Sequence, residues 1–182
     1  MKTYTAFLNS KRVAQGELPE VALKLKKQLR PGEMALVFDD LTGGQVDINL
    51  RGSADAVTKR LQPAIEPAKP AGPGRPRLGV VSREISLLPR HWDWLALQPG
   101  GASVTLRKLV EDAKKKNSSA DRERMAREAT HKFLSAIAGD LPHFEEALRA
   151  LYARKEDLFE TLLQSWPKDI RQHALAMAED GW

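Results

Sequence analysis

Residues 80–113 hold the stretch that decides the fold of the middle of this chain, VVSREISLLPRHWDWLALQPGGASVTLRKLVEDA. Val80 to Leu88 is short and rich in apolar residues, which predicts a strand. Pro89 has the fixed φ that begins a helix, and Gly100-Gly101 breaks the chain after it. The amphipathic run from Ala102 to Ala113 predicts a second helix. We therefore expect a strand, a helix, a glycine turn and a helix, in this order.

Toward the N-terminus, residues 1–62 predict a small α+β domain. Apolar residues that alternate with polar ones predict strands at 3–8, 12–15, 34–38 and 45–50. Apolar residues at three- and four-residue spacing predict a helix at 19–29, and Ser53 is a suitable cap for a second helix at 54–61.

Two further parts complete the expected organisation. The prolines and glycines of residues 63–79 predict a basic linker, because they favour neither a helix nor a strand. Residues 117–182 predict a domain of four helices. The first begins at the caps Asn117 to Ser119, the next two are expected at 142–153 and 157–165, and Trp166-Pro167 breaks the chain before the last. The fold class is therefore α+β: a small N-terminal domain at 1–62, the linker, the strand–helix–helix segment at 80–116, and a C-terminal helical bundle.

The composition excludes several classes of protein. The chain has no cysteine, which rules out disulfides and thiolate metal sites. It has no run of about 18 apolar residues and no apolar N-terminal leader, so we expect a cytoplasmic protein without membrane contact. Glycine loops for phosphates and nucleophile elbows are also absent from the sequence, so we expect no enzyme, no cofactor and no metal.

The net charge of +5 is concentrated in the middle of the chain. Residues 63–117 hold ten Lys/Arg and five Asp/Glu, whereas residues 118–182 hold nine and twelve. A basic segment of this kind favours nucleic acid as a partner. Within it, Gly74-Arg-Pro-Arg77 resembles an AT-hook, in which arginines enter an A·T-rich minor groove, although Pro73 stands where that motif has another arginine. The alternative is a linker end that is basic for no functional reason.

The strand, helix, turn and helix of residues 80–116 resemble a ribbon–helix–helix unit. In that fold the strands of two chains pair in the major groove, and the helices interlock as the dimer core. The resemblance implies a homodimer that binds DNA, with a phosphate held at the N-terminus of the second helix. The expected DNA contacts are Arg75, Arg77, Arg83, Arg90, Ser103, Lys114 and Lys115. The expected dimer interface is Ile85, Leu87, Trp92, Trp94, Leu95, Leu106 and Leu109.

The alternation of the expected strand makes it a poor reader of bases. One register places Arg83, Ile85 and Leu87 on the groove face, and the other places Glu84 there, which would repel phosphates. The same segment could therefore serve dimerisation alone, or form a hairpin packed on the N-terminal domain. Lys114 to Lys116 could likewise only complement the dipole at the end of a helix.

Asp39, Asp40 and Asp47 form a second kind of candidate, because an expected hairpin brings them close together. Three carboxylates could hold a hard cation in a small hydrolase, but turn chemistry explains Asp39-Asp40 equally well. The four histidines, which are His91, His131, His143 and His173, have no spacing typical of a zinc site.

Several stretches together resemble an uncharacterised bacterial family of unknown function. They are GRPRLGVV at 74–81, LLPRHWDWL at 87–95, GGAS at 100–103, GDLPHFEEA at 139–147, Trp166-Pro167, and VFDDLTG at 37–43. The resemblance covers nearly the whole chain but implies no function. From the residues we expect a homodimeric DNA-binding protein, such as a transcriptional regulator or nucleoid-type binder, that acts through residues 74–116. The alternative is an interaction or scaffold protein in which that segment only dimerises. The outer domains would bind a protein or ligand that the sequence does not identify.

Overall fold

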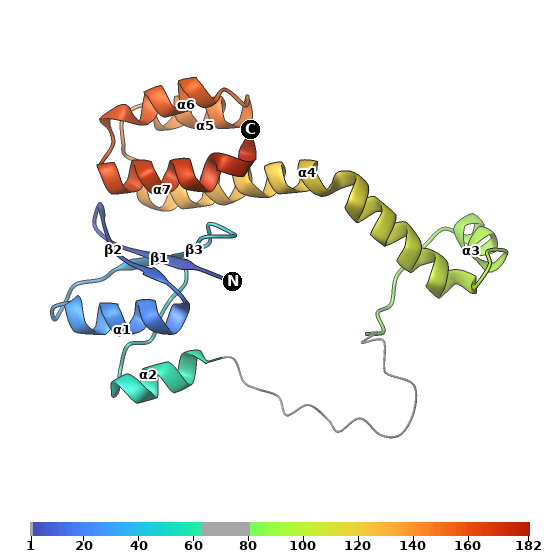
Figure 1. Cartoon of the computed structure of the whole chain (residues 1–182), viewed down its shortest axis with the longest axis horizontal. Coiled ribbons are helices and arrows are strands. Elements are labelled where there is room, and N and C mark those ends of the chain that lie inside the picture. The colour runs from blue at the N-terminus through green and yellow to red at the C-terminus, as the bar shows by residue number, and fades with distance from the viewer. Residues whose placement is uncertain (1, 63–80) are drawn as a thin grey trace. The chain divides into compact units, whose positions relative to one another are not determined.

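The structure, a computed structural model, describes residues 2–62 and 81–182. Arg75, Arg77 and the expected linker therefore lie outside the described residues. The strands are β1 (Tyr4–Leu8), β2 (Lys11–Gly16) and β3 (Leu36–Asp39). The helices are α1 (Leu18–Gln28), α2 (Ala54–Leu61), α3 (Pro89–Ala96), α4 (Gly101–Ile137), α5 (Phe144–Tyr152), α6 (Glu156–Leu162) and α7 (Lys168–Ala178), with single 3-10 turns at Leu163–Ser165 and Glu179–Gly181. The expected α+β class is confirmed (Figure 1).

The three strands form one antiparallel sheet in the order β2-β1-β3. Its register pairs Tyr4 with both Gly16 and Asp39, and a bulge at Ala6/Phe7 shifts the pairing of β1 with β2. A fourth strand at 45–50 was predicted, and this prediction is wrong. Only Gln45 makes a bridge, to Phe38. Ile48 and Leu50 pack against the core beside α1 instead of continuing the ladder.

The two faces of the sheet bury different residues, because side chains alternate along a strand. Ala6 and Val37 face α1, where they pack with Val21 and Leu25. Phe7 and Phe38 face the other way, into a larger core built by α4, α5, α6 and α7. Figure 1 shows α1 on one side of the sheet and α4 and α7 on the other, with α5 and α6 beyond α7.

A cluster of aromatic rings joins the sheet to the C-terminal helices. The ring centroid of Phe133, on α4, lies 4.9 Å from that of Phe38 and 5.5 Å from that of Phe7. The described residues up to 62 and those from 119 onward therefore form one compact unit, and residues 81–118 belong to a second. This corrects the predicted division into separate domains at 1–62 and 117–182, because a shared core holds the two segments together.

The turn after β3 also contacts the C-terminal half. Gly43 has a φ of +65°, and a Cβ placed on it would overlap the backbone of Ala129 in α4. Glycine is therefore required at this position on two grounds, the left-handed backbone and the close approach of a helix.

Helix α4 is much longer than the sequence predicts. The expected caps Asn117, Ser118 and Ser119 lie inside it, and the helix runs without a break to Ile137. The Ser118 hydroxyl donates to the carbonyl of Lys115 at 3.2 Å, so a residue type that favours caps is satisfied within the helix. The last three predicted helices are confirmed as α5, α6 and α7.

Residues 81–88, which are the described part of the predicted strand Val80 to Leu88, are not in a strand. All of them are exposed except Leu87, which is half-buried. A strand needs a partner for its backbone groups, and the described chain provides none here. The ribbon–helix–helix resemblance therefore gains no support from the structure.

Candidate interaction surface

Helix α3 and the first turns of α4 form a hairpin. Pro89 is the first residue of α3, and the carbonyl of Leu88 accepts the N–H of His91 at 2.8 Å. Gly100 and Gly101, with φ of +88° and +72°, reverse the chain into α4. This helix, turn and helix agree with the sequence-based prediction, except that α4 begins at Gly101 and continues beyond Ala113.

The hairpin has almost no core of its own. Among residues 81–118, only Leu95 and Thr105 are buried, with exposed fractions of 2% and 9%. Eight large apolar side chains of the same segment are exposed: Val81, Ile85, Leu88, Trp92, Trp94, Leu97, Leu109 and Val110. We call these eight residues the hairpin surface. Most of the large apolar side chains of this segment are thus open to solvent, where they are available to contact another molecule.

Most of the predicted dimer residues lie on the hairpin surface. Ile85, Trp92, Trp94 and Leu109 are exposed, and Leu87 and Leu106 are half-buried. Leu95 is different, because it is buried inside the hairpin and is not available to a partner. Trp92 and Trp94 are both exposed, although they lie only two residues apart on α3.

The predicted DNA-contacting residues are solvated where they are described. Arg83, Arg90, Lys114 and Lys115 are exposed. Ser103 is exposed in the first turn of α4, and its carbonyl accepts a hydrogen bond from Arg107 Nε at 3.1 Å. Lys114 Nζ lies 3.5 Å from Glu111 Oε1, an exposed ion pair that contributes little to stability. The structure thus leaves these cations accessible without gathering them into a defined site.

Three buried polar side chains, which sequence reasoning missed, lie in the sheet, directly after it and in α7. Thr5 Oγ1, Asp40 Oδ1 and His173 Nε2 are buried and lack a hydrogen-bond partner in the described chain. His173 Nε2 lies 3.6 Å from Asp40 Oδ1, which is beyond hydrogen-bond distance. One signal was available, because Asp40 follows Phe38 by two residues and so continues the face of the sheet that points into the core.

The surroundings of His173 keep its ring neutral. Its centroid lies 4.7 Å from that of Phe133 and 5.5 Å from that of Phe7. Burial lowers the pKa of His173, and the Arg12 charge lowers it further, so that together they outweigh the opposing effect of Asp40. The backbone N–H of Arg12 also donates to Asp169 Oδ2 at 2.9 Å, which joins β2 to the first turn of α7. The Arg12–Asp169 hydrogen bond and the packing of the His173 ring on Phe7 therefore join α7 to the sheet.

The three carboxylates of the predicted cation site are divided among different partners. Asp39 accepts hydrogen bonds from the N–H of Leu41 and pairs with Lys2 Nζ at 2.8 Å. Burial acts to raise the pKa of Asp39, but Lys2 and these backbone donors outweigh it, so the pKa lies below its ordinary value. Asp40 faces His173, and Asp47 is exposed. Within residues 2–62 and 81–182, no three Asp, Glu or His side chains are placed to hold a metal ion.

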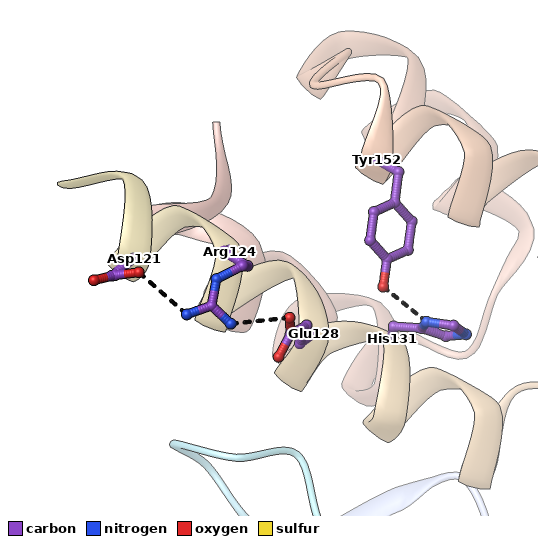
Figure 2. A network of polar contacts seen from close by, with 5 residues as sticks. All are labelled: Asp121, Arg124, Glu128, His131 and Tyr152. Carbon is purple, nitrogen blue, oxygen red and sulfur yellow. Dashed lines mark hydrogen bonds and ion pairs between the residues drawn. The ribbon is translucent and has the colours of Figure 1, made fainter. Parts of the chain in front are cut away.

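Figure 2 shows polar contacts along α4. Arg124 pairs with Asp121 at 3.1 Å and with Glu128 at 3.2 Å on the exposed face of the helix. His131 Nδ1 lies 2.9 Å from the Tyr152 hydroxyl, which reaches it from the end of α5 (Figure 2). The two ion pairs lie within α4, and the His131–Tyr152 contact joins α4 to α5, so all three have a structural role at the surface.

A shallow hollow of about 210 Å³ lies between the end of α1 and residues 46–50. Apolar side chains line most of it, including Leu25, Leu29 and Ile48, and the carboxylates of Glu33 and Asp47 are also part of its lining. It brings together no pair of acid and base groups suited to catalysis.

The comparisons with known proteins place the chain in a family. The model of a family described as an uncharacterised protein conserved in bacteria, DUF2239, matches residues 3–178. The chain belongs to the DUF2239 family. The resemblance to an uncharacterised bacterial family is thereby confirmed, and the DUF2239 match takes in the sheet, the hairpin and the C-terminal helices alike. Neither the curated proteins nor the solved structures gave a match.

The described helices of this DUF2239 protein do not meet the requirements of a membrane span. None of those in residues 2–62 and 81–182 combines the length and the apolar character that crossing a bilayer requires.

Proposed function

We propose that this DUF2239 protein is a non-enzymatic interaction protein of the cytoplasm, and that it acts as a homodimer held together by the hairpin surface. The observation that carries the proposal is the contrast between the eight exposed large apolar side chains and the two buried residues of the same segment. Removal of apolar area from water stabilises an association by roughly 25 cal/mol per Å². A partner that covers the hairpin surface would supply the burial that the hairpin does not achieve alone.

The first test compares two leucines of nearly equal exposure. Leu109, on the hairpin surface, is 47% exposed, and Leu158, on α6, is 45% exposed. We expect sedimentation equilibrium to show a dimer for the wild-type protein and for Leu158→Ser, and a much weaker dimer for Leu109→Ser. A wild-type protein that stays monomeric at every concentration would overturn the proposal.

A second candidate function is DNA binding by the same dimer. It is supported by the exposed cations of the hairpin and of the turns that follow, which are Arg83, Arg90, Arg107, Lys108, Lys114, Lys115 and Lys116. Without a ribbon, these residues would contact phosphates and not bases, so binding would depend strongly on salt and weakly on sequence.

Mobility shift of a duplex tests this second candidate. We expect retardation at low salt that weakens steeply as salt rises. The triple change Lys114→Ser, Lys115→Ser and Lys116→Ser should make the DNA affinity depend less steeply on salt concentration. The triple change Lys24→Ser, Lys27→Ser and Lys59→Ser removes the same charge from exposed positions outside the hairpin and is the matched control. Absence of any retardation at low salt would exclude DNA binding.

A further inference from the structure

The first turns of α4 carry a narrow apolar stripe. Leu106, Leu109, Val110 and Ala113 recur at the three- and four-residue spacing that places them on one face of a helix. Leu106 is half-buried by the hairpin, whereas Leu109 and Val110 are 47% and 55% exposed. Leu109 and Val110 are therefore the part of the hairpin surface that another helix can cover.

Charged residues flank this stripe in a fixed order. Arg107 and Glu111 lie one turn apart on one side, and Lys108 and Asp112 lie one turn apart on the other. On both sides the cation precedes the anion, which is the less favourable order for an ion pair within one helix. Accordingly, the described structure shows no Arg107–Glu111 or Lys108–Asp112 ion pair, and Glu111 instead lies near Lys114.

The same order is complementary to a second copy that runs antiparallel. About a two-fold axis between Leu109 and Val110, residues on the same side of the stripe meet, so that Arg107 comes opposite Glu111 of the partner subunit and Lys108 opposite Asp112 of the partner subunit. Farther from the axis, Lys114 to Lys116 come opposite the uncharged Ser103 to Thr105. In a parallel pair, by contrast, residues of like charge lie at the same level along the two helix axes and face each other.

We propose that two copies pair antiparallel through the first turns of α4, with the axis between Leu109 and Val110 and with Arg107 and Lys108 of each copy facing Glu111 and Asp112 of the other. This rests on the proposed homodimer and adds its orientation and register. The interface is isologous, so each contact occurs twice.

Disulfide cross-linking tests the orientation, because the chain has no cysteine of its own. Ser103 and Lys114 are exposed on the same side of the stripe, about 17 Å apart along one helix at 1.5 Å per residue. In the antiparallel pair, Ser103 of one copy and Lys114 of the partner subunit lie on the same side of the stripe and within about 3 Å of each other along the helix axis, which is two residues at 1.5 Å per residue. We expect Ser103→Cys mixed with Lys114→Cys to form a mixed disulfide under mild oxidation, and neither variant to cross-link with itself.

Charge reversal tests the register. We expect the double change Arg107→Glu and Lys108→Glu to weaken the dimer by about tenfold or more, since it opposes like charges. The double change Glu111→Lys and Asp112→Lys should do the same, and an equimolar mixture of the two variants should associate again. Circular dichroism checks that each variant keeps its helix content.

The outcomes separate this inference from the proposed function. A monomeric wild-type protein removes both. If the wild-type protein is a dimer but Ser103→Cys cross-links with itself, the antiparallel register is excluded and the dimer is not. The same holds if the mixture of Ser103→Cys and Lys114→Cys forms no disulfide. A dimer that both charge reversals leave unchanged also removes the register.

Discussion

His173 Nε2 lies 3.6 Å from Asp40 Oδ1 in the interior of the protein, and both atoms lack a hydrogen-bond partner in the described chain. Asp40 follows β3 and His173 lies in the middle of α7, so the pair spans the junction between the sheet and the C-terminal helices. Unpaired buried polar groups cost free energy. This junction is therefore a place where stability depends on protonation.

Acid should destabilise the protein through His173. Burial lowers the pKa of His173 below its ordinary value of 6.5, so between that folded-state pKa and 6.5 the unfolded chain binds more protons than the folded one. The free energy of unfolding then falls as pH drops below 6.5. Urea denaturation at a series of pH values should show this slope in the wild-type protein and lose it in His173→Leu.

Substitution of an exposed histidine provides the control for this experiment. His91 is exposed in α3, so His91→Ala should keep the wild-type slope. An unchanged slope in His173→Leu would mean that another group titrates in this range.

Phe133→Ala should destabilise the sheet and the C-terminal helices together. The ring is fully buried and contacts Phe7, Phe38 and His173, so its removal leaves a cavity that costs about 3–5 kcal/mol. We expect hydrogen exchange, measured at increasing urea concentration, to show the amides of the sheet and of the C-terminal helices losing protection in one transition. In the variant this transition should lie at a lower urea concentration than in the wild-type protein. Loss of protection in the helices alone, with the sheet intact, would contradict the shared core.

Gly43→Ala should be far more damaging than Gly32→Ala. Both glycines have a positive φ, which costs an alanine about 1–2 kcal/mol. At Gly32 the new Cβ would meet nothing within 4 Å, whereas at Gly43 it would overlap the backbone of Ala129. The difference in melting temperature between the two variants measures the steric cost at the contact between the turn and α4. Equal losses of stability in the two variants would show that Gly43 does not lie close to Ala129.

Trp166→Phe and Tyr152→Phe compare a buried with an exposed hydrogen bond. Trp166 Nε1 donates to the carbonyl of Pro142 at 2.7 Å from a side chain that is 4% exposed. We expect its loss, with part of the ring, to cost about 1–3 kcal/mol. Tyr152 is exposed, so loss of its contact with His131 should cost less than about 1 kcal/mol. Urea denaturation of both variants measures the two losses of stability.

Local patterns were sufficient where a segment's own residues decide its structure. Alternation predicted β1 and β2 and helical spacing predicted α1, because the buried face of each element is visible as a period. The cap Ser53 and the proline Pro89 marked the starts of α2 and α3. The same patterns located α5, α6 and α7. Motifs spread along the chain also predicted the bacterial family to which the protein belongs.

Predictions were wrong where a choice depends on distant contacts. Residues 45–50 alternate like a strand, but Ile48 and Leu50 gain more by packing beside α1. Asn117 to Ser119 have the composition of a helix cap, yet they lie within α4, where a serine hydroxyl can bond to the preceding turn. Residues 81–88 resemble a strand, but the described part of the chain offers them no ladder to join.

By itself, the sequence determined the class of the fold, most of its elements, the family, and the concentration of positive charge in the middle of the chain. Only the tertiary structure decided that Phe7 and Phe38 share a core with Phe133, that Asp40 meets His173, and that Trp92 and Trp94 are both exposed. The physical reason is that periodicity shows which face of an element is apolar, whereas the surface that covers this face comes from residues far away in the sequence.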